Sequence, residues 1–264
     1  MKCVYCHNEG NFSKEVLDKQ DIEKLIKNSQ DLNLKSVRLT GGEPLIHPQI
    51  REICEMLSKK YALKVGINTN CIEINKLLTI INDGNIDRVV VGIDYFNNKV
   101  SKNSPVGESS QKILNNILQL KRKGCDISIA SVYFGDDENK LKLIDWAIKN
   151  GIRIKIIEQV LQIKDEQITN EYNKFKNKVI KKYGEKVYVD EFNELNICIS
   201  NKKMITFFHS HCAANECDIC KKIHIRIAAD GSINQCLYGS EKINIKDKNF
   251  KEEFKKLLEG YVGG

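Results

Sequence analysis

Several features that mark other classes of protein are missing from this sequence. No run of apolar residues approaches the roughly 20 residues of a membrane-spanning helix, and the chain has neither an internal repeat nor a low-complexity tract. Hydrophobic residues at 41% and charged residues at 29% exclude wholesale disorder. The chain opens on Met1-Lys2-Cys3 rather than on a secretory signal, so we expect a cytoplasmic protein with no membrane partner.

Arginine is scarce in a chain that is otherwise rich in basic residues. Only six of the 42 Lys and Arg residues are arginines, and the net charge is +7. Lysines stand beside acidic residues in helix-like stretches, and no arginine-rich stripe or aromatic-interleaved basic patch is present. The charge therefore predicts a solvated surface and no nucleic-acid partner, with a mild preference for anionic substrates as the alternative.

Cysteine, by contrast, is abundant, with ten residues in 264. Stable disulfides are rare in the cytoplasm, so ten thiols there indicate metal or redox chemistry. Cys3 and Cys6 are separated by two residues, a spacing that suits a metal clasp, a redox dithiol or half of a zinc site. Cys54, Cys125 and Cys198 stand in helix-like or strand-like contexts and are predicted to be buried, inert thiols.

Four further cysteines form a second group near the end of the chain. They are Cys212, Cys217, Cys220 and Cys236. Their spacing, C-x4-C-x2-C-x15-C, suits zinc as well as an iron–sulfur cluster. Residues 223–227 alternate in polarity and Asp230-Gly231 predicts a turn, so we expect a β-hairpin between two of these ligands.

Helix-like and strand-like segments alternate from residue 20 to about residue 160. Helical spacing of apolar residues predicts helices over 21–32, 49–60, 74–83, 109–123 and 139–150. Short runs rich in Val and Ile predict strands over 36–40, 63–69, 88–94, 126–134 and 153–158. This alternation is typical of a parallel sheet with right-handed crossovers, so we expect an α/β fold with a partial or full barrel.

The pattern changes after residue 160. A Lys-rich amphipathic helix is predicted over 165–183, and hairpin-like strands over 186–190 and 195–200. An apolar segment over 204–208 then leads into the cysteine-rich segment. We therefore predict two domains, residues 1–162 with the alternating segments and residues 163–264 as a smaller α+β domain.

Unusual residues follow three of the predicted strands. Thr40-Gly41-Gly42-Glu43-Pro44 follows the first, whereas Asn70 and Asp94 follow or end the next two. In barrels of parallel strands, the chemistry sits at the carboxyl ends of the strands. The two glycines free the backbone to approach a ligand, and Glu43 places a carboxylate beside them. Each segment taken alone is also compatible with a plain turn between strand and helix.

The Cys3-x2-Cys6 pair and the Gly-Gly-Glu-Pro turn together resemble the radical S-adenosylmethionine superfamily. In that superfamily, three cysteines spaced C-x3-C-x2-C hold three irons of a [4Fe–4S] cluster, and the fourth iron binds S-adenosylmethionine. Cys3 and Cys6 match the second and third of these cysteines, with the aromatic Tyr5 just before the third. The expected fold is then a partial (β/α) barrel of the radical SAM type.

The resemblance also implies the cofactors and the residues that meet them. Gly41, Gly42 and Glu43 would contact the methionyl end of S-adenosylmethionine. Asn70 and Asp94 would line the site nearby. With a reducing electron donor, the cluster would cleave the cofactor to a 5′-deoxyadenosyl radical that abstracts hydrogen from a substrate.

The first cysteine of the superfamily pattern has no counterpart in the printed chain. It would lie two residues ahead of Met1, and the superfamily's first strand would precede it. We therefore expect an N-terminally truncated chain, with a degenerate, inactive homologue as the alternative. As printed, the chain has two of the three cluster ligands, too few to hold that cluster stably.

Nearly the whole chain resembles the molybdenum cofactor biosynthesis protein A family, the GTP cyclases of molybdenum-cofactor biosynthesis. The likeness runs through residues 3–10 and the Lys-rich helix with its strand pair, and returns at 225–231 and 236–239. It implies a C-terminal domain of the "twitch" type that holds a second, auxiliary [4Fe–4S] cluster. The ligands would be Cys217, Cys220 and Cys236, with Cys212 as a candidate fourth.

The same likeness implies which residues would meet the substrate. Arg226 would bind the substrate, and the paired glycines Gly263 and Gly264 would reach into the active site. The two glycines are equally compatible with a frayed C-terminus that has no role in the site.

Two departures from this family put GTP in doubt as the substrate. His224 stands at the first position of an arginine pair that the family has after its second auxiliary cysteine, and Arg226 stands at the second after an insertion. His47-Pro48 replaces another arginine pair. Three hypotheses therefore stay open: a nucleotide-rearranging radical enzyme, a peptide-modifying radical enzyme, and a zinc- or cluster-stabilised homologue without catalysis.

Three histidines, His7, His209 and His211, also suit a metal site by residue type. Because the thiols would satisfy both clusters, we expect these imidazoles to pack or to support the ligands rather than to bind metal.

Overall fold

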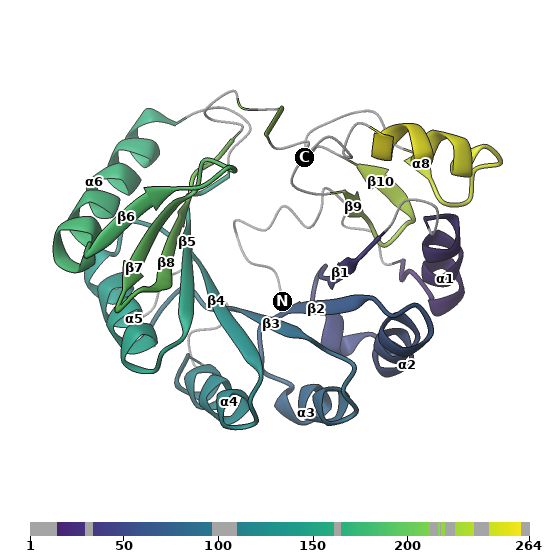
Figure 1. The fold of residues 1–264 in the computed structure, drawn as a ribbon, viewed down its shortest axis with the longest axis horizontal. Coiled ribbons are helices and arrows are strands. Elements are labelled where there is room, and N and C mark those ends of the chain that lie inside the picture. The colour runs from purple at the N-terminus through teal and green to yellow at the C-terminus, as the bar shows by residue number, and fades with distance from the viewer. Residues whose placement is uncertain are drawn as a thin grey trace. The chain divides into compact units, whose positions relative to one another are not determined.

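The computed structural model describes residues 15–29, 34–96, 110–160, 165–211, 216, 218–219, 225–234 and 243–259. The chain divides into two compact units. The middle unit contains Thr69–Ile74 and Val89–Glu216, and the terminal unit contains the described residues up to Asn68, Asn75–Arg88 and those from 218 onward. Figure 1 labels their helices and strands.

The middle unit is built around a sheet with the strand order β3-β4-β5-β8-β7-β6. The strands are β3 (Arg88–Gly92), β4 (Asp126–Val132), β5 (Arg153–Ile157), β6 (Lys186–Val189), β7 (Leu195–Ile199) and β8 (Lys202–Phe208). Strands β4, β5 and β8 run parallel, whereas β7 pairs antiparallel with β8 and with β6. The parallel sheet therefore continues past residue 162 into the segment around 204–208.

Helices α4 (Ser110–Arg122), α5 (Asp137–Lys149) and α6 (Glu166–Tyr183) contact β4, β5 and β7 respectively (Figure 1). Asp136 caps α5 by accepting a hydrogen bond from Asn139 N at 3.0 Å, and Asp165 caps α6 in the same way. The Lys-rich α6 buries Tyr172, Phe175 and Val179, which lie on one face at helical spacing.

The terminal unit pairs β1 (Ser36–Leu39) with β2 (Lys64–Thr69) in parallel, with Val37 opposite Val65. Its helices here are α1 (Lys19–Asn28), α2 (Ile50–Glu55) and α3 (Ile74–Asn82). A short 3₁₀ helix, Pro44–Ile46, precedes α2, and a π-helical turn, Met56–Lys60, follows it. Val65 and Ile67 of β2 are fully buried, so this strand lies in the core of its unit.

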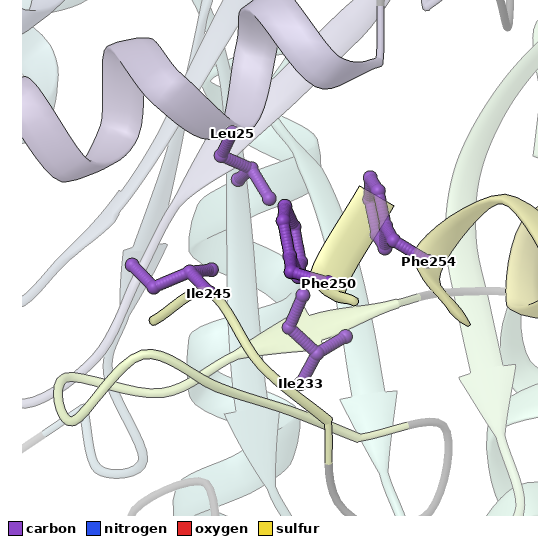
Figure 2. Close-up of a cluster of buried hydrophobic side chains, with 5 residues drawn as sticks. All are labelled: Leu25, Ile233, Ile245, Phe250 and Phe254. Carbon is purple, nitrogen blue, oxygen red and sulfur yellow. The ribbon is translucent and has the colours of Figure 1, made fainter. Parts of the chain in front are cut away.

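The last described segments also belong to the terminal unit. Strand β10 (Ser232–Asn234) pairs antiparallel with β9 (Arg226–Ile227) and with β11 (Ile243–Asn244), and α8 (Phe250–Glu259) follows. Figure 2 shows their shared apolar cluster, in which Leu25 of α1 points toward Phe250 of α8. The members of the cluster are Leu25, Ile233, Ile245, Phe250 and Phe254. Apolar burial thus joins α1 to segments more than 200 residues away in the chain.

The predicted helices and strands are confirmed, with ends that shift by a few residues. The first helix begins at Lys19 and ends at Asn28 rather than spanning 21–32, and β3 ends at Gly92 before Asp94. The hairpin around Asp230-Gly231 is confirmed by β9 and β10. Helix α8 and strand β11 were not predicted. No helix among the described residues is both long enough and apolar enough to cross a bilayer.

Candidate functional site

The turn after β1 leaves its backbone open. Gly41 has a φ of +125°, a conformation that side chains with a Cβ rarely adopt. A Cβ added to Gly41 or to Gly42 would have no heavy atom within 4 Å, and both residues are exposed. The peptide groups of this turn are therefore accessible to a ligand.

Glu43 is the half-buried residue that closes this turn. Its Oε1 accepts a hydrogen bond from Leu45 N at 3.2 Å, which caps the 3₁₀ helix Pro44–Ile46. Leu45 is 1% exposed and anchors the helix in the core. The carboxylate of Glu43 is thus fixed directly beside the open glycine backbone.

His47, the residue after the short helix Pro44–Ile46, serves the local structure. Its Nε2 lies 3.1 Å from Leu17 O, and its Nδ1 accepts a hydrogen bond from Gln49 N at 3.0 Å. Both contacts are satisfied by a neutral imidazole that donates from Nε2. This residue therefore holds the segment ahead of α1 and the start of α2.

Asn70 follows β2 in a turn that is closed by its own side chains. Asn70 Oδ1 accepts from Ile72 N and Thr69 Oγ1 accepts from Cys71 N, each at 2.9 Å. Cys71 is buried with a φ of +59°, and its carbonyl accepts from Asn116 Nδ2 at 2.8 Å. Local hydrogen bonds define this turn.

Asp94 lies in the middle unit, just past the end of β3. Its Oδ1 accepts from Val132 N at 2.8 Å, and its carbonyl oxygen accepts from Lys140 Nζ at 2.8 Å. Lys140 also donates to Ser131 Oγ at 2.5 Å and to Val132 O at 2.6 Å. The three ammonium protons thus meet three acceptors at the ends of β3 and β4.

Lys140 is 2% exposed, and burial is the main cause that lowers its pKa to about 8. The negative charges of Asp94 and Asp136 oppose that shift. We did not predict this residue as a site residue. Its position in the sequence could have revealed it, because Lys140 stands in the apolar row of α5, one helical turn before Leu143 and Ile144, which are both fully buried.

Glu158, 3% exposed, closes the carboxyl end of β5. Its Oε1 accepts from Thr169 Oγ1 at 2.8 Å and its Oε2 accepts from Ser210 N at 2.7 Å. The hydroxyl of Tyr172 lies 2.7 Å from Phe208 O. These bonds join α6 to the ends of β5 and β8, and sequence reasoning gave no sign of them.

Beyond β8, two histidines converge on one carboxylate. His209 Nε2 lies 2.6 Å and His211 Nδ1 lies 2.9 Å from Glu216 Oε2, while Asn193 Nδ2 donates to Glu216 Oε1 at 2.8 Å. Burial acts to raise the pKa of Glu216, but the bonds from His211 and His209 outweigh it and lower the pKa. His211 Nε2 is buried without a partner among the described residues, a cost of about 1–3 kcal/mol.

The predicted site residues fall into described and undescribed groups. Gly41, Gly42 and Glu43 lie together in the terminal unit, Arg226 lies in β9 of that unit, and Asn70 and Asp94 lie in the middle unit. The predicted ligands and tail, namely Cys3, Cys6, Cys212, Cys217, Cys220, Cys236, Gly263 and Gly264, are outside the described residues. Their roles therefore stay predictions.

Three cysteines predicted to be inert have the expected surroundings. Cys54 and Cys198 are buried, and Cys125 is partly buried. Burial raises the pKa of Cys54 to about 12 and also raises that of Cys125. Neither of these two thiols would be ionised at neutral pH.

Curated proteins similar to this chain are GTP 3′,8-cyclases. The enzyme of Alkaliphilus oremlandii is 26% identical over 98% of this chain and 84% of that enzyme. The enzyme of Clostridium perfringens is 25% identical over 94% of this chain and 80% of that enzyme. A probable GTP 3′,8-cyclase of Methanococcus maripaludis is 27% identical over 60% of this chain and 54% of that enzyme.

Two solved proteins are similar in fold at 17% identity. The structure of anSMEcpe with bound AdoMet matches with a TM-score of 0.69 over 98% of this chain and 76% of that chain. SuiB of Streptococcus suis bound to its precursor peptide SuiA matches with a TM-score of 0.66 over 95% of this chain. This chain spans 61% of SuiB. These likenesses confirm the predicted α/β fold of the radical SAM type.

The family comparison agrees with the motifs and with the fold. The model of the radical SAM superfamily matches residues 1–147, more than half of the chain, including the Cys3-x2-Cys6 pair and the Gly41–Glu43 turn. The chain belongs to the radical SAM superfamily.

Proposed function

We propose that this protein is a radical enzyme that cleaves S-adenosylmethionine reductively and abstracts hydrogen from a nucleotide, in a rearrangement of the GTP-cyclase type. The observation that carries the proposal is the open turn at Gly41 and Gly42 with the fixed Glu43 carboxylate beside it. Accessible peptide groups next to a carboxylate suit the amino and carboxylate groups of an amino-acid cofactor.

Each residue of this chain would have a separate task toward the cofactors. Cys3 and Cys6 would hold a [4Fe–4S] cluster as thiolates, and Glu43 would orient the methionyl amino group. Bound together, the cluster and S-adenosylmethionine would supply the 5′-deoxyadenosyl radical. Asn70 and Asp94 would border the cofactor, on strand ends made rigid by the bonds to Ile72 and Lys140. Because thiolate ligands need a reducing compartment, the proposal places the protein in the cytoplasm.

A second, auxiliary [4Fe–4S] cluster belongs to the same proposal. Its ligands would be Cys217, Cys220 and Cys236, with Cys212 as the candidate fourth. Arg226, the paired glycines Gly263 and Gly264, and an external electron donor would complete the machinery. The GTP 3′,8-cyclases that are similar over nearly the whole chain support a nucleotide substrate in molybdenum-cofactor biosynthesis.

A peptide substrate is the second candidate, and two observations favour it. SuiB, which is similar in fold, is known bound to a precursor peptide. In addition, His47, which on the family resemblance replaces an arginine, is engaged by Leu17 and Gln49. The loss of one basic contact weakens the case for triphosphate recognition.

The test is product analysis under anaerobic conditions. The protein, with any coding sequence upstream of Met1 retained, is reconstituted with iron and sulfide and incubated with S-adenosylmethionine, a reductant and GTP. We expect a brown protein that forms 5′-deoxyadenosine faster when GTP is present. Glu43→Gln is the informative variant, because Gln keeps the bond from Leu45 N but removes the negative charge.

Three other outcomes would each count against a different part of the proposal. Deoxyadenosine formation that does not respond to GTP counts against the nucleotide and directs attention to peptides encoded beside the gene. A colourless protein that holds only zinc contradicts the radical reaction itself. Equal activity of the Glu43→Gln variant contradicts the role given to Glu43.

A further inference from the structure

The two histidines and the carboxylate beyond β8 have no role in the radical chemistry proposed above. One ligand atom from each of His209, His211 and Glu216 lies within 4.8 Å of the other two. His209 and His211 face the same oxygen, Glu216 Oε2, from 2.6 and 2.9 Å. Three side chains that commonly bind metals thus converge on one point.

The surrounding structure holds these side chains in place. Asn193 donates to Glu216 Oε1 at 2.8 Å, and Glu216 N donates to His211 O at 2.8 Å. The two imidazole rings meet edge to face at 4.7 Å, and Phe208 packs against His211 at 5.2 Å. Ligands that are ordered in advance lose little entropy when an ion binds.

Hydrogen bonding within the described part of the chain accounts for only one ring nitrogen of His211, the Nδ1 that faces Glu216. This side chain is 3% exposed, and its Nε2 has no partner among the described residues. The two nitrogens of an imidazole ring point in diverging directions, so this Nε2 does not face Glu216 and is not the ligand atom of the candidate site.

We propose that His209, His211 and Glu216 bind one divalent transition-metal ion, with Asn193 as the positioning residue that orients the carboxylate. Two imidazoles and one carboxylate form a ligand set used by zinc and by non-haem iron(II). With metal bonds of roughly 2.0–2.2 Å, the two histidine nitrogens would have to move away from Glu216 Oε2 by only a fraction of an ångström to about 1 Å. The site uses no thiol, although His211 and Glu216 each adjoin a cysteine, Cys212 and Cys217, that is proposed for the auxiliary cluster.

Cobalt(II) titration of the full chain tests this proposal, with Glu216→Gln as the main variant. Gln keeps the shape of the side chain and one oxygen that can accept from Asn193 Nδ2, so we expect the fold to be preserved while the charged ligand is lost. We expect Glu216→Gln to weaken cobalt binding at this site by more than about 100-fold. Substituting a residue that only hydrogen-bonds to a metal ligand already lowers metal affinity by about 10–100-fold. Asn193→Ala should weaken it by about 10-fold.

Spectroscopy separates this site from the cysteines. The difference spectrum between the wild type and Glu216→Gln should contain cobalt d–d bands without thiolate-to-cobalt charge transfer. Glu194→Gln is the matched control. Glu194 is the neighbour of Asn193 in the chain but pairs with Lys155, so its substitution should leave cobalt binding unchanged. His209→Gln should lose the same single equivalent of cobalt as Glu216→Gln.

Two results of the cobalt titration would overturn the proposal. One is cobalt binding by Glu216→Gln that equals that of the wild type. The other is a difference spectrum dominated by thiolate charge transfer. Competition by zinc(II) in one arm and by iron(II) under anaerobic conditions in the other shows which ion displaces cobalt, and displacement by neither also contradicts the site.

Discussion

The turn after β1 and the strand ends at Asn70 and Asp94 all carry polar residues, but they are built in opposite ways. At Gly41 and Gly42, the backbone is exposed and an added Cβ would meet no heavy atom within 4 Å. At Asn70 and Asp94, side-chain oxygens accept backbone N–H groups at 2.9 and 2.8 Å. The first is an open turn, and the other two are closed strand ends.

This difference shows that a polar residue at a strand end can serve two purposes. In the open turn, glycine removes side chains so that a ligand can approach the peptide groups. In the closed strand ends, the polar atoms replace hydrogen bonds that a strand loses where its ladder stops.

Removing the buried ammonium of Lys140 should disrupt the hydrogen bonds at the strand end of Asp94 and cause the largest loss of stability. Lys140→Met leaves three acceptors, Asp94 O, Ser131 Oγ and Val132 O, without their donor. We expect the free energy of unfolding to fall by about 3 kcal/mol in urea denaturation. Lys178→Met, which removes an exposed pair with Asp137, is the control and should cost less than about 1 kcal/mol. Equal losses in the two variants would contradict the role of Lys140.

Lys140 should also make the free energy of unfolding depend on pH. Its pKa is lowered from 10.5 to about 8 in the fold, mainly by burial. Above pH 8 the unfolded chain therefore binds more protons than the native protein, so this group adds stability as pH rises toward 10.5. Below pH 8 that contribution is absent.

The measurement compares urea denaturation of the wild type and Lys140→Met at several pH values. The difference in unfolding free energy between them should increase by about 2 kcal/mol from pH 8 to about 9.5. A difference that stays constant over this range would show that Lys140 titrates as it does in the unfolded chain.

Alanine substitutions at Gly41 and Gly42 test whether the backbone of the open turn is constrained. Gly41→Ala forces a Cβ into a φ of +125° and should cost about 1–2 kcal/mol of stability. Gly42→Ala carries no such strain and should be neutral or stabilise by less than about 1 kcal/mol. Both variants should weaken binding of S-adenosylmethionine to the reconstituted protein, since each narrows the turn. If Gly41→Ala and Gly42→Ala are equally stable, the backbone at Gly41 is not constrained.

The smallest effect is expected at Asn70. Asn70→Ala removes the acceptor of the Ile72 N–H and should cost about 1 kcal/mol, because the turn is only partly buried. Asn70→Asp keeps an acceptor at the same place and should retain most of that stability. Thermal denaturation of the two variants tests this, and a loss in Asn70→Asp as large as that in Asn70→Ala would contradict the turn.

Regular elements were predictable from local patterns. Strands β2 and β5 and helix α6 follow from apolar runs and helical spacing, since a periodic sequence leaves one way to bury its apolar face. Helix α8 was not predicted, although Phe250, Phe254 and Leu257 have helical spacing. The sequence does not show what this apolar face packs against, which is the cluster around Leu25.

The candidate site was predictable only in part. The Gly41–Glu43 turn was recognisable because glycine and a carboxylate at a strand end form a local motif. Lys140 and Glu158 were not recognised, since each has a partner at a strand end that is distant in the chain. Glu216 was not recognised because its contacts with His209 and His211 depend on how the chain turns after β8.

The sequence by itself determined the superfamily, the order of helices and strands, and the open turn. Each of these depends on residues that are neighbours along the chain, where spacing and conformational preference act directly. Only the tertiary structure decided that Lys140 is buried beneath Asp94 and that two histidines meet Glu216. Lys140 meets Asp94 because neighbouring strands place residues from distant segments at hydrogen-bond distance, whereas the histidines meet Glu216 because the chain turns back on itself after β8.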